Sequence, residues 1–150
     1  NLLIPSSVLS INKPSVLRLG SLNVSKIEKI LGKKIISNIN PRNKIAPGQS
    51  LLHYSPGVPL KMNAKNAKKN EAFVLIKKRK KNFNNYFYLS KKNNLNEAAK
   101  NLYSCLRKIK NKGYKSIAVE KIKDIGIGKS INDRLKRASK FWISIFNYCV

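Results

Sequence analysis

The sequence predicts an α/β protein whose C-terminal part is a Rossmann-like domain built on a parallel sheet. Residues 72–76 form a continuous apolar run, as expected of a strand that is covered on both faces. Residues 95–109 place apolar side chains at helical spacing. A second strand-like run at 116–119 and a second helical pattern at 131–138 follow. This alternation of strands and helices is typical of parallel sheets with right-handed crossovers.

The chain begins with a smaller group of elements. Residues 6–11 and 16–19 have strand character and are separated by the turn residues Asn12, Lys13 and Pro14, which predicts a hairpin-like pair. A strand pair followed by one short helix is too little to close a hydrophobic core. We therefore expect residues 1–36 to need a packing partner outside this sequence.

The short helix of this first group is predicted from both its spacing and its ends. Ser25 and Glu28 match a capping box at its start, and Gly32 stands where a glycine commonly ends a helix. The apolar residues that recur at helical spacing are Val24, Ile27, Ile30 and Leu31.

Residues 37–57 are polar and rich in Asn, Pro and Gly, which predicts an irregular linker. The proline–glycine pairs that begin at Pro47 and Pro56 are turn signals. Between them lie His53, the only histidine of the chain, and Tyr54. From the residues alone, this pair is either a structural anchor or part of a functional loop.

The remaining elements of the C-terminal domain are predicted in order. Residues 58–62 are a candidate edge strand and residues 86–89 are a further strand. Asn94 with Glu97 is expected to cap the long helix, and Gly113 to end it.

For the final helix, Ser130 and Asp133 match a capping box that would start it. A phosphate-binding loop at Gly126–Ser130 fails on spacing, because Lys123 occupies the position of its first glycine. The dinucleotide fingerprint fails as well, since Ile131 stands in place of its third glycine.

The composition leaves two interpretations of the charge open. Lys and Arg number 32 against 6 Asp and Glu, which gives a formal net charge of +26. A dense cationic surface favours nucleic-acid binding. Abundant Lys, Asn and Ile also follow from an AT-rich genome, and no RNA-recognition, helix-turn-helix or zinc-finger pattern accompanies the lysines. The denser run at 77–81 fits either interpretation.

The remaining composition predicts a cytoplasmic protein without a metal site. Cys105 and Cys149 lie far apart with no metal-ligand spacing, and Cys105 is expected to be a buried free thiol. No apolar run reaches the roughly 18–20 residues needed to span a bilayer, and no secretory leader pattern is present.

Several stretches carry unusual residue patterns in a fixed order. Residues 6–9 read Ser-Ser-Val-Leu and residues 17–20 read Leu-Arg-Leu-Gly. Residues 46–56 contain Pro-Gly, a short run, and then His-Tyr-x-Pro. Residues 126–138 contain Gly-x-Gly followed by Ile-Asn-Asp-Arg-Leu-x-Arg-Ala. Together these patterns resemble the Sua5 family of two-domain threonylcarbamoyl-AMP synthases. The departures from the family pattern are Pro5, Ser7, Leu19, Ala46 and Gln49.

The resemblance implies a division of the chain. Residues 1–36 would be the end of an α+β YrdC-like catalytic domain, and 37–57 the interdomain linker that folds over the catalytic pocket as a lid. Residues 58–141 would be the C-terminal domain, followed by a tail of unknown role at 142–150. On this view the chain is a fragment, and the lysine-rich wall of the catalytic cleft lies upstream of it.

The resemblance also implies roles for particular residues. Ser6 would lie beside the substrate threonine, and Arg18, His53 and Tyr54 beside the nucleotide. An arginine suits that place because its planar fork pairs with phosphate oxygens. The lid would further contain Pro47, Gly48, Ser50 and Pro56. A structural rather than catalytic role, in a polar network at the start of the last helix or facing the linker, is expected for Gly126, Gly128, Asn132, Asp133 and Arg134.

The activity implied by the resemblance is that of a nucleotidyltransferase. Such enzymes join L-threonine, bicarbonate and ATP, usually with Mg²⁺, into threonylcarbamoyl-AMP and diphosphate. The product serves the threonylcarbamoyladenosine (t6A) modification of tRNA. We expect the 150 residues to be inactive without the catalytic domain. Two alternatives remain: a basic module that binds tRNA or other polyanions, and a noncatalytic regulatory or docking domain.

Overall fold

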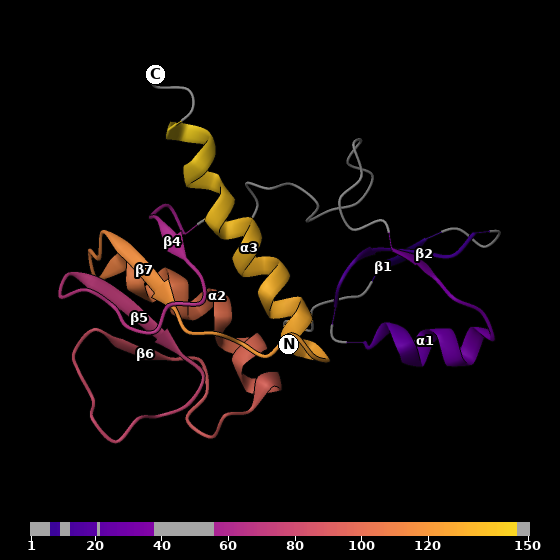
Figure 1. Cartoon of the computed structure of the whole chain (residues 1–150), viewed down its shortest axis with the longest axis horizontal. Helices are drawn as coiled ribbons and strands as arrows, with labels where there is room; N and C mark the ends of the chain where they lie inside the picture. The colour runs from indigo at the N-terminus through magenta and orange to yellow at the C-terminus, as the bar shows by residue number, and fades with distance from the viewer. Residues whose placement is uncertain (1–6, 10–12, 21, 38–55, 147–150) are drawn as a thin grey trace.

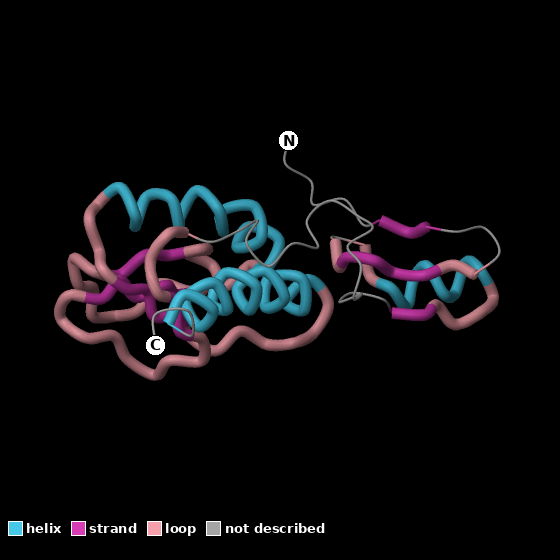
Figure 2. Tube along the Cα trace, turned by 90° about the horizontal axis from the view of Figure 1, so that it is seen from above, coloured by secondary structure: helices cyan, strands magenta, loops and turns pink. Residues whose placement is uncertain are grey.

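The computed structural model describes residues 7–9, 13–20, 22–37 and 56–146, which form two groups of elements (Figure 1). The first group holds a three-stranded sheet and helix α1. The second holds a four-stranded sheet with helices α2 and α3 (Figure 2). The α/β class and the parallel sheet predicted from the sequence are confirmed.

The first sheet has the strand order β1-β2-β3. Strand β1 (Ser7–Leu9) pairs antiparallel with β2 (Ser15–Arg18), so the predicted hairpin-like pair is confirmed. Strand β3 (Ile36–Ser37) pairs parallel with β2 on its other side. The sequence did not predict β3, because two residues are too few to show a strand period.

Helix α1 (Val24–Leu31) begins with a different cap from the predicted one. The side chain of Asn23 accepts a hydrogen bond from the Ser25 N–H at 3.2 Å. The Glu28 carboxylate instead accepts from the Ile35 N–H at 3.0 Å, so the predicted capping box of Ser25 and Glu28 is wrong. Asn23 lies one residue before the helix, where an Asn cap is favoured. Gly32 ends the helix with φ 66°, as predicted.

The second sheet is parallel throughout, with the order β4-β7-β5-β6. Its strands are β4 (Leu60–Lys61), β5 (Glu71–Leu75), β6 (Tyr86–Tyr88) and β7 (Ser116–Val119). Strand β4 lies at an edge, and every residue of the central strand β5 is buried, as the sequence predicted. Residues 76–85, which join β5 to β6, contain no helix.

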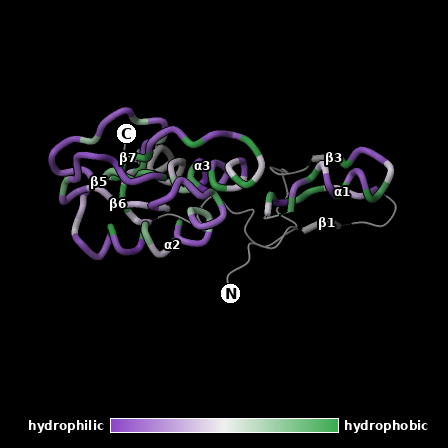
Figure 3. The backbone as a smooth tube through the Cα atoms, turned by 90° about the horizontal axis from the view of Figure 1, so that it is seen from below, coloured by the Kyte–Doolittle hydropathy of each residue, from purple (hydrophilic) through white to green (hydrophobic). Residues whose placement is uncertain are grey.

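The two faces of this sheet are covered differently. On one face, Ala72, Val74 and Ile76 belong to a core that includes side chains of α2 (Leu95–Asn111) and α3 (Ile127–Phe146). On the other face, Phe73 and other β5 and β7 side chains pack against small residues of the loop before β5. Because side chains of both helices belong to the first of these cores, both helices lie on one face. Hydrophilic stretches dominate the loops, and hydrophilic and hydrophobic segments alternate along the helices (Figure 3).

Helix α2 starts and ends as predicted, with one change in detail. The Asn94 side chain accepts from the N–H groups of Asn96 and Glu97 at 2.9 and 3.1 Å. The Ser90 hydroxyl accepts from the Asn94 N–H at 3.0 Å and donates to the Glu97 carboxylate at 2.6 Å. Ser90 thus takes the place that Glu97 has in a capping box. Gly113 follows the helix with φ 77°.

Cys105 lies on the buried face of α2 as a free thiol, as expected. Burial disfavours the charged thiolate, and the nearby charge of Lys108 opposes this only in part. The pKa of Cys105 is consequently raised to about 11. Cys149 lies outside the described residues.

Helix α3 begins at Ile127, three residues before the predicted cap. Ser130 and Asp133 therefore lie inside the helix, and their prediction as a capping box is wrong. The early start is possible because Gly128 has no side chain: a Cβ at this position would lie 2.0 Å from the Lys123 carbonyl oxygen. The helix also continues through 141–146, beyond the predicted end of the domain. None of the described helices combines the length and apolar character that crossing a bilayer requires.

We expect Gly128→Ala to lower the free energy of unfolding by about 1–3 kcal/mol, because the loop that contains the Lys123 carbonyl must move away. In an ordinary helical position the same change stabilises by about 1 kcal/mol. Chemical denaturation followed by circular dichroism measures the difference. Lys129→Ala, at the exposed neighbouring position, is the control and should change little. A Gly128→Ala variant as stable as the wild type would contradict the close approach.

Glu71 provides a pH-dependent test of the sheet. Burial by itself would raise the pKa of Glu71, but hydrogen bonds from Lys61 and the Lys68 N–H, with the charge of Lys61, outweigh it. The pKa is therefore lowered from its usual value of 4.5, and the ionised carboxylate stabilises the fold above that pH. This contribution is lost as the pH falls through the lowered pKa.

We accordingly expect Glu71→Gln to be less stable than the wild type at pH 7, with the difference shrinking as the pH falls below about 4.5. Urea unfolding of both proteins at pH 7 and at pH 3 measures the two differences. Equal differences at the two pH values would mean that the ionised form of Glu71 is not the stabilising one.

Candidate functional site

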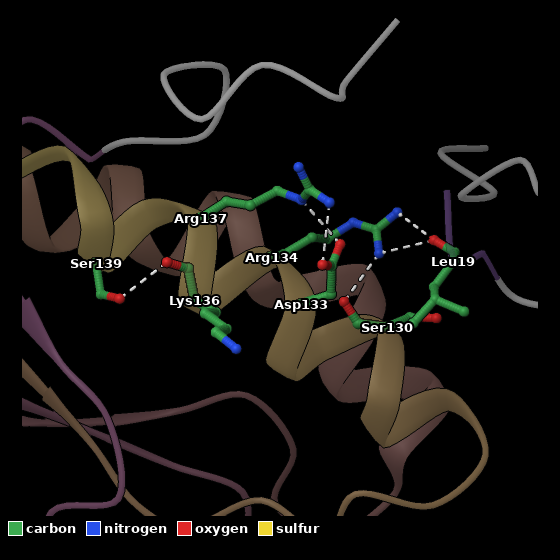
Figure 4. A network of polar contacts seen from close by, with 7 residues as sticks. All are labelled: Leu19, Ser130, Asp133, Arg134, Lys136, Arg137 and Ser139. Carbon is green, nitrogen blue, oxygen red and sulfur yellow. Dashed lines mark hydrogen bonds and ion pairs between the residues drawn. The ribbon is translucent and has the colours of Figure 1, made fainter. Parts of the chain in front are cut away.

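The end of strand β2 meets the first turns of helix α3, and this contact joins the two groups of elements (Figure 4). The Ser130 hydroxyl donates a 2.6 Å hydrogen bond to the carbonyl oxygen of Gly20. Both terminal nitrogens of Arg134 donate to the Leu19 carbonyl oxygen, each at 3.3 Å. Two neighbouring backbone carbonyls are thus held by two side chains that lie one helical turn apart.

Burial makes this contact specific. Ser130 is 2% exposed and Arg134 is 3% exposed. A buried guanidinium is costly unless hydrogen-bond acceptors surround it. Arg134 finds them in the Leu19 carbonyl and, at 2.9 Å, in the Ser130 carbonyl of its own helix. The buried charge of Arg134 therefore depends on β2, because a displaced β2 would take the Leu19 carbonyl away from it.

The neighbouring polar residues fix the helix start. Asp133 accepts from the Arg137 guanidinium at 3.0 and 3.1 Å, one turn along α3. The Asn132 amide donates to the Ile122 carbonyl at 3.2 Å and to the Asp124 carboxylate at 3.0 Å. The Asn132 bonds tie the loop before α3 to the helix, while the bonds between Asp133 and Arg137 lie within it.

Arg18 and Pro56 are the predicted nucleotide and lid residues that the structure describes. Arg18 is the last residue of β2, directly before Leu19. Pro56 is buried and begins the second group of described residues. Ser6, the threonine-binding candidate, lies outside the described residues, as do the other lid candidates Pro47, Gly48, Ser50, His53 and Tyr54.

Sequence reasoning missed the contacts of Ser130 and Arg134 with β2. These residues are separated from Gly20 and Leu19 by 110 and 115 positions. The one available signal was the spacing of four between a serine and an arginine, which puts both on the same face of a helix. The sequence-based capping box assigned Ser130 to a local role instead.

All six acidic residues of the chain fall within the described part, and each accepts a hydrogen bond. Glu28 and Glu97 bind the groups named above, and Glu120 accepts from the Ile76 N–H and from Arg79 at 3.3 Å. Glu71, Asp124 and Asp133 accept in the same way. Among the described residues, no three His, Cys, Asp or Glu side chains gather as a metal site would require.

Comparison with known proteins identifies the family. The family model of the threonylcarbamoyl-AMP synthase C-terminal domain matches residues 22–140. This chain belongs to the Sua5 family. Comparison with the curated proteins gives no match.

Two solved Sua5 structures share the fold of this chain. One is P. abyssi Sua5 in complex with L-threonine, at 24% identity and a TM-score of 0.68; the match covers 85% of this chain and 43% of that one. The second is a P. abyssi Sua5 variant in which an adjacent histidine and tyrosine are both replaced by alanine. It has 20% identity and a TM-score of 0.60, and the match covers 85% of this chain and 42% of the other. This chain thus spans less than half of the length of these relatives.

Proposed function

We propose that this chain is the C-terminal part of an L-threonylcarbamoyl-AMP synthase that serves t6A modification of tRNA. The observation that carries the proposal is the family match over residues 22–140, which extends from the N-terminal helix to the last helix. The intact enzyme joins L-threonine, bicarbonate and ATP. The threonine amine and bicarbonate give a carbamate with loss of one water molecule. A carbamate oxygen then attacks the α-phosphorus of ATP, and diphosphate leaves.

In this reaction the protein positions reactants and stabilises charge. Arg18 is assigned to the nucleotide phosphates and Ser6 to the threonine. Mg²⁺ would accompany ATP, but the described residues do not fit a metal site, because no three of their His, Cys, Asp or Glu side chains gather in one place.

The pair His53 and Tyr54 is assigned to a lid that excludes water from the nucleotide. Exclusion matters because the carbamate and the mixed anhydride must survive until transfer. One of the similar solved structures replaces an adjacent histidine and tyrosine, and this chain has a single histidine, followed directly by a tyrosine. This supports assigning His53 and Tyr54 to the same element.

The uncovered apolar residues of the first group support its assignment to a larger domain. Ile30 is 84% exposed, and Ile36 and Leu22 are 61% and 60% exposed. Helix α1 buries none of its residues, although apolar side chains line one side of it. We assign this surface to the contact with the rest of a YrdC-like catalytic domain upstream of the chain.

The activity test compares the 150-residue chain with the same chain extended by its upstream catalytic domain. We expect threonylcarbamoyl-AMP and diphosphate from L-threonine, bicarbonate and ATP with the extended protein and none with the chain. His53→Ala combined with Tyr54→Ala should lower turnover about 100-fold, because water enters the pocket. Lys136→Met, on the exposed side of α3, is the control. An inactive extended protein, or an active 150-residue chain, would overturn the proposal.

The apolar surface of α1 gives an independent test. In the 150-residue chain, Ile30→Ala should change the free energy of unfolding by no more than about 0.5 kcal/mol, as for exposed positions. In the extended protein the same change should cost about 2 kcal/mol or more, because Ile30 becomes buried. Lys29→Ala is the control in both proteins. Equal effects of Ile30→Ala in the two proteins would show that this surface stays exposed.

A further inference from the structure

We propose that Ser130 and Arg134 are positioning residues, through which the C-terminal domain holds the catalytic strand β2 in place. This inference rests on the proposed function and assigns the C-terminal domain a task within it. Both side chains donate hydrogen bonds to backbone carbonyls. They act on the backbone that follows Arg18, the residue assigned to the nucleotide phosphates.

The geometry concentrates the contact at one point of the strand. Arg18 is followed directly by Leu19 and Gly20, the two residues whose carbonyls α3 holds at 3.3 Å and 2.6 Å. A peptide plane is rigid, so fixing two successive carbonyls fixes the direction of the chain as it leaves Arg18. The strand is thereby prevented from shifting along its own axis at its carboxyl end.

Strand β2 also pairs with the strand that follows Ser6, the residue assigned to the threonine. In the antiparallel pair, Arg18 lies opposite Ser7, and Ser7 directly follows Ser6 in the sequence. Strand β2 is also the middle strand of its sheet, with β3 on its other side. A displacement of β2 would therefore move Arg18. It would also move β1, the partner strand that directly follows Ser6, the threonine-binding candidate.

Arginine suits this task better than lysine. Its planar fork places two N–H groups on the Leu19 carbonyl while one of its nitrogens also reaches the Ser130 carbonyl. If β2 moved away, these donors would lose an acceptor inside a site where Arg134 is 3% exposed. The cost of that loss favours the single arrangement in which β2 is held.

A contact that only adds stability and a contact that positions β2 predict different kinetics. Loss of stability lowers the amount of folded enzyme and so lowers the apparent kcat without changing KM for ATP. Misplacement of Arg18 raises KM for ATP in the enzyme that remains folded. Both kcat and KM for ATP are therefore measured for each variant, at a temperature well below its unfolding midpoint.

The test uses the extended protein with its upstream domain, in the forms Ser130→Ala, Ser130→Thr, Arg134→Met and Arg134→Lys. We expect Arg134→Met to raise KM for ATP about ten-fold with less than about a three-fold change in kcat, since small misplacements of a binding group are costly. Arg134→Lys should recover only part of this, and Ser130→Thr, which keeps the hydroxyl, should resemble the wild type. Lys136→Met is the matched control, because it removes a cation from the exposed side of the same helix.

A second measurement does not depend on activity. Hydrogen exchange of the amides in residues 15–20 of the extended protein should become about ten-fold faster in Arg134→Met and stay unchanged in Lys136→Met. An active wild type whose Ser130 and Arg134 variants keep KM for ATP would overturn the inference and leave the proposed function standing. An extended wild-type protein that makes no threonylcarbamoyl-AMP would overturn both. Unchanged exchange in Arg134→Met would overturn the contact itself.

Discussion

The close approach between the loop carbonyl of Lys123 and the backbone of Gly128 is the constraint on which the arrangement around α3 depends. Because Gly128 has no side chain, the helix can start at Ile127 directly beneath that carbonyl. Within α3, Ser130 and Arg134 bind the end of β2, while Asn132 reaches back to the loop.

The acidic residues of this protein lie beside hydrogen-bond donors. In a chain with 32 basic residues, each of the six carboxylates accepts a hydrogen bond from a backbone or side-chain donor. Acidic residues thus occur where a strand start, a helix or a loop requires a strong acceptor. The buried cation Arg134 likewise has hydrogen-bond partners, but these are backbone carbonyls and not carboxylates. The lysines whose exposure the structure describes lie on the surface.

The two sheets differ in how far they are self-sufficient. The parallel sheet is covered on both faces, and the apolar residues of β5 and β7 are at most 1% exposed. The first group buries Val16 and Leu17 but leaves large apolar side chains of α1 and β3 in contact with solvent. The described residues therefore form one closed core and one open core.

The sequence by itself determined the elements whose signals are local. The buried run at β5, the apolar stripe and Asn94 cap of α2, and the glycines after α1 and α2 all follow from short-range chemistry, and each was predictable. Family membership was predictable as well, because its motifs are contiguous.

Tertiary structure alone decided the contacts that join distant segments. The start of α3 was mispredicted because Ser130 and Asp133 satisfy a local capping pattern, whereas the folded loop before α3 brings the Lys123 carbonyl against Gly128 and the helix begins at Ile127. The partners of Ser130 and Arg134 lie more than a hundred residues away, and no local pattern encodes a backbone carbonyl as an acceptor. Every residue carries the same backbone carbonyl, whatever its side chain. Only the folded chain therefore determines which carbonyl accepts a hydrogen bond from a buried arginine.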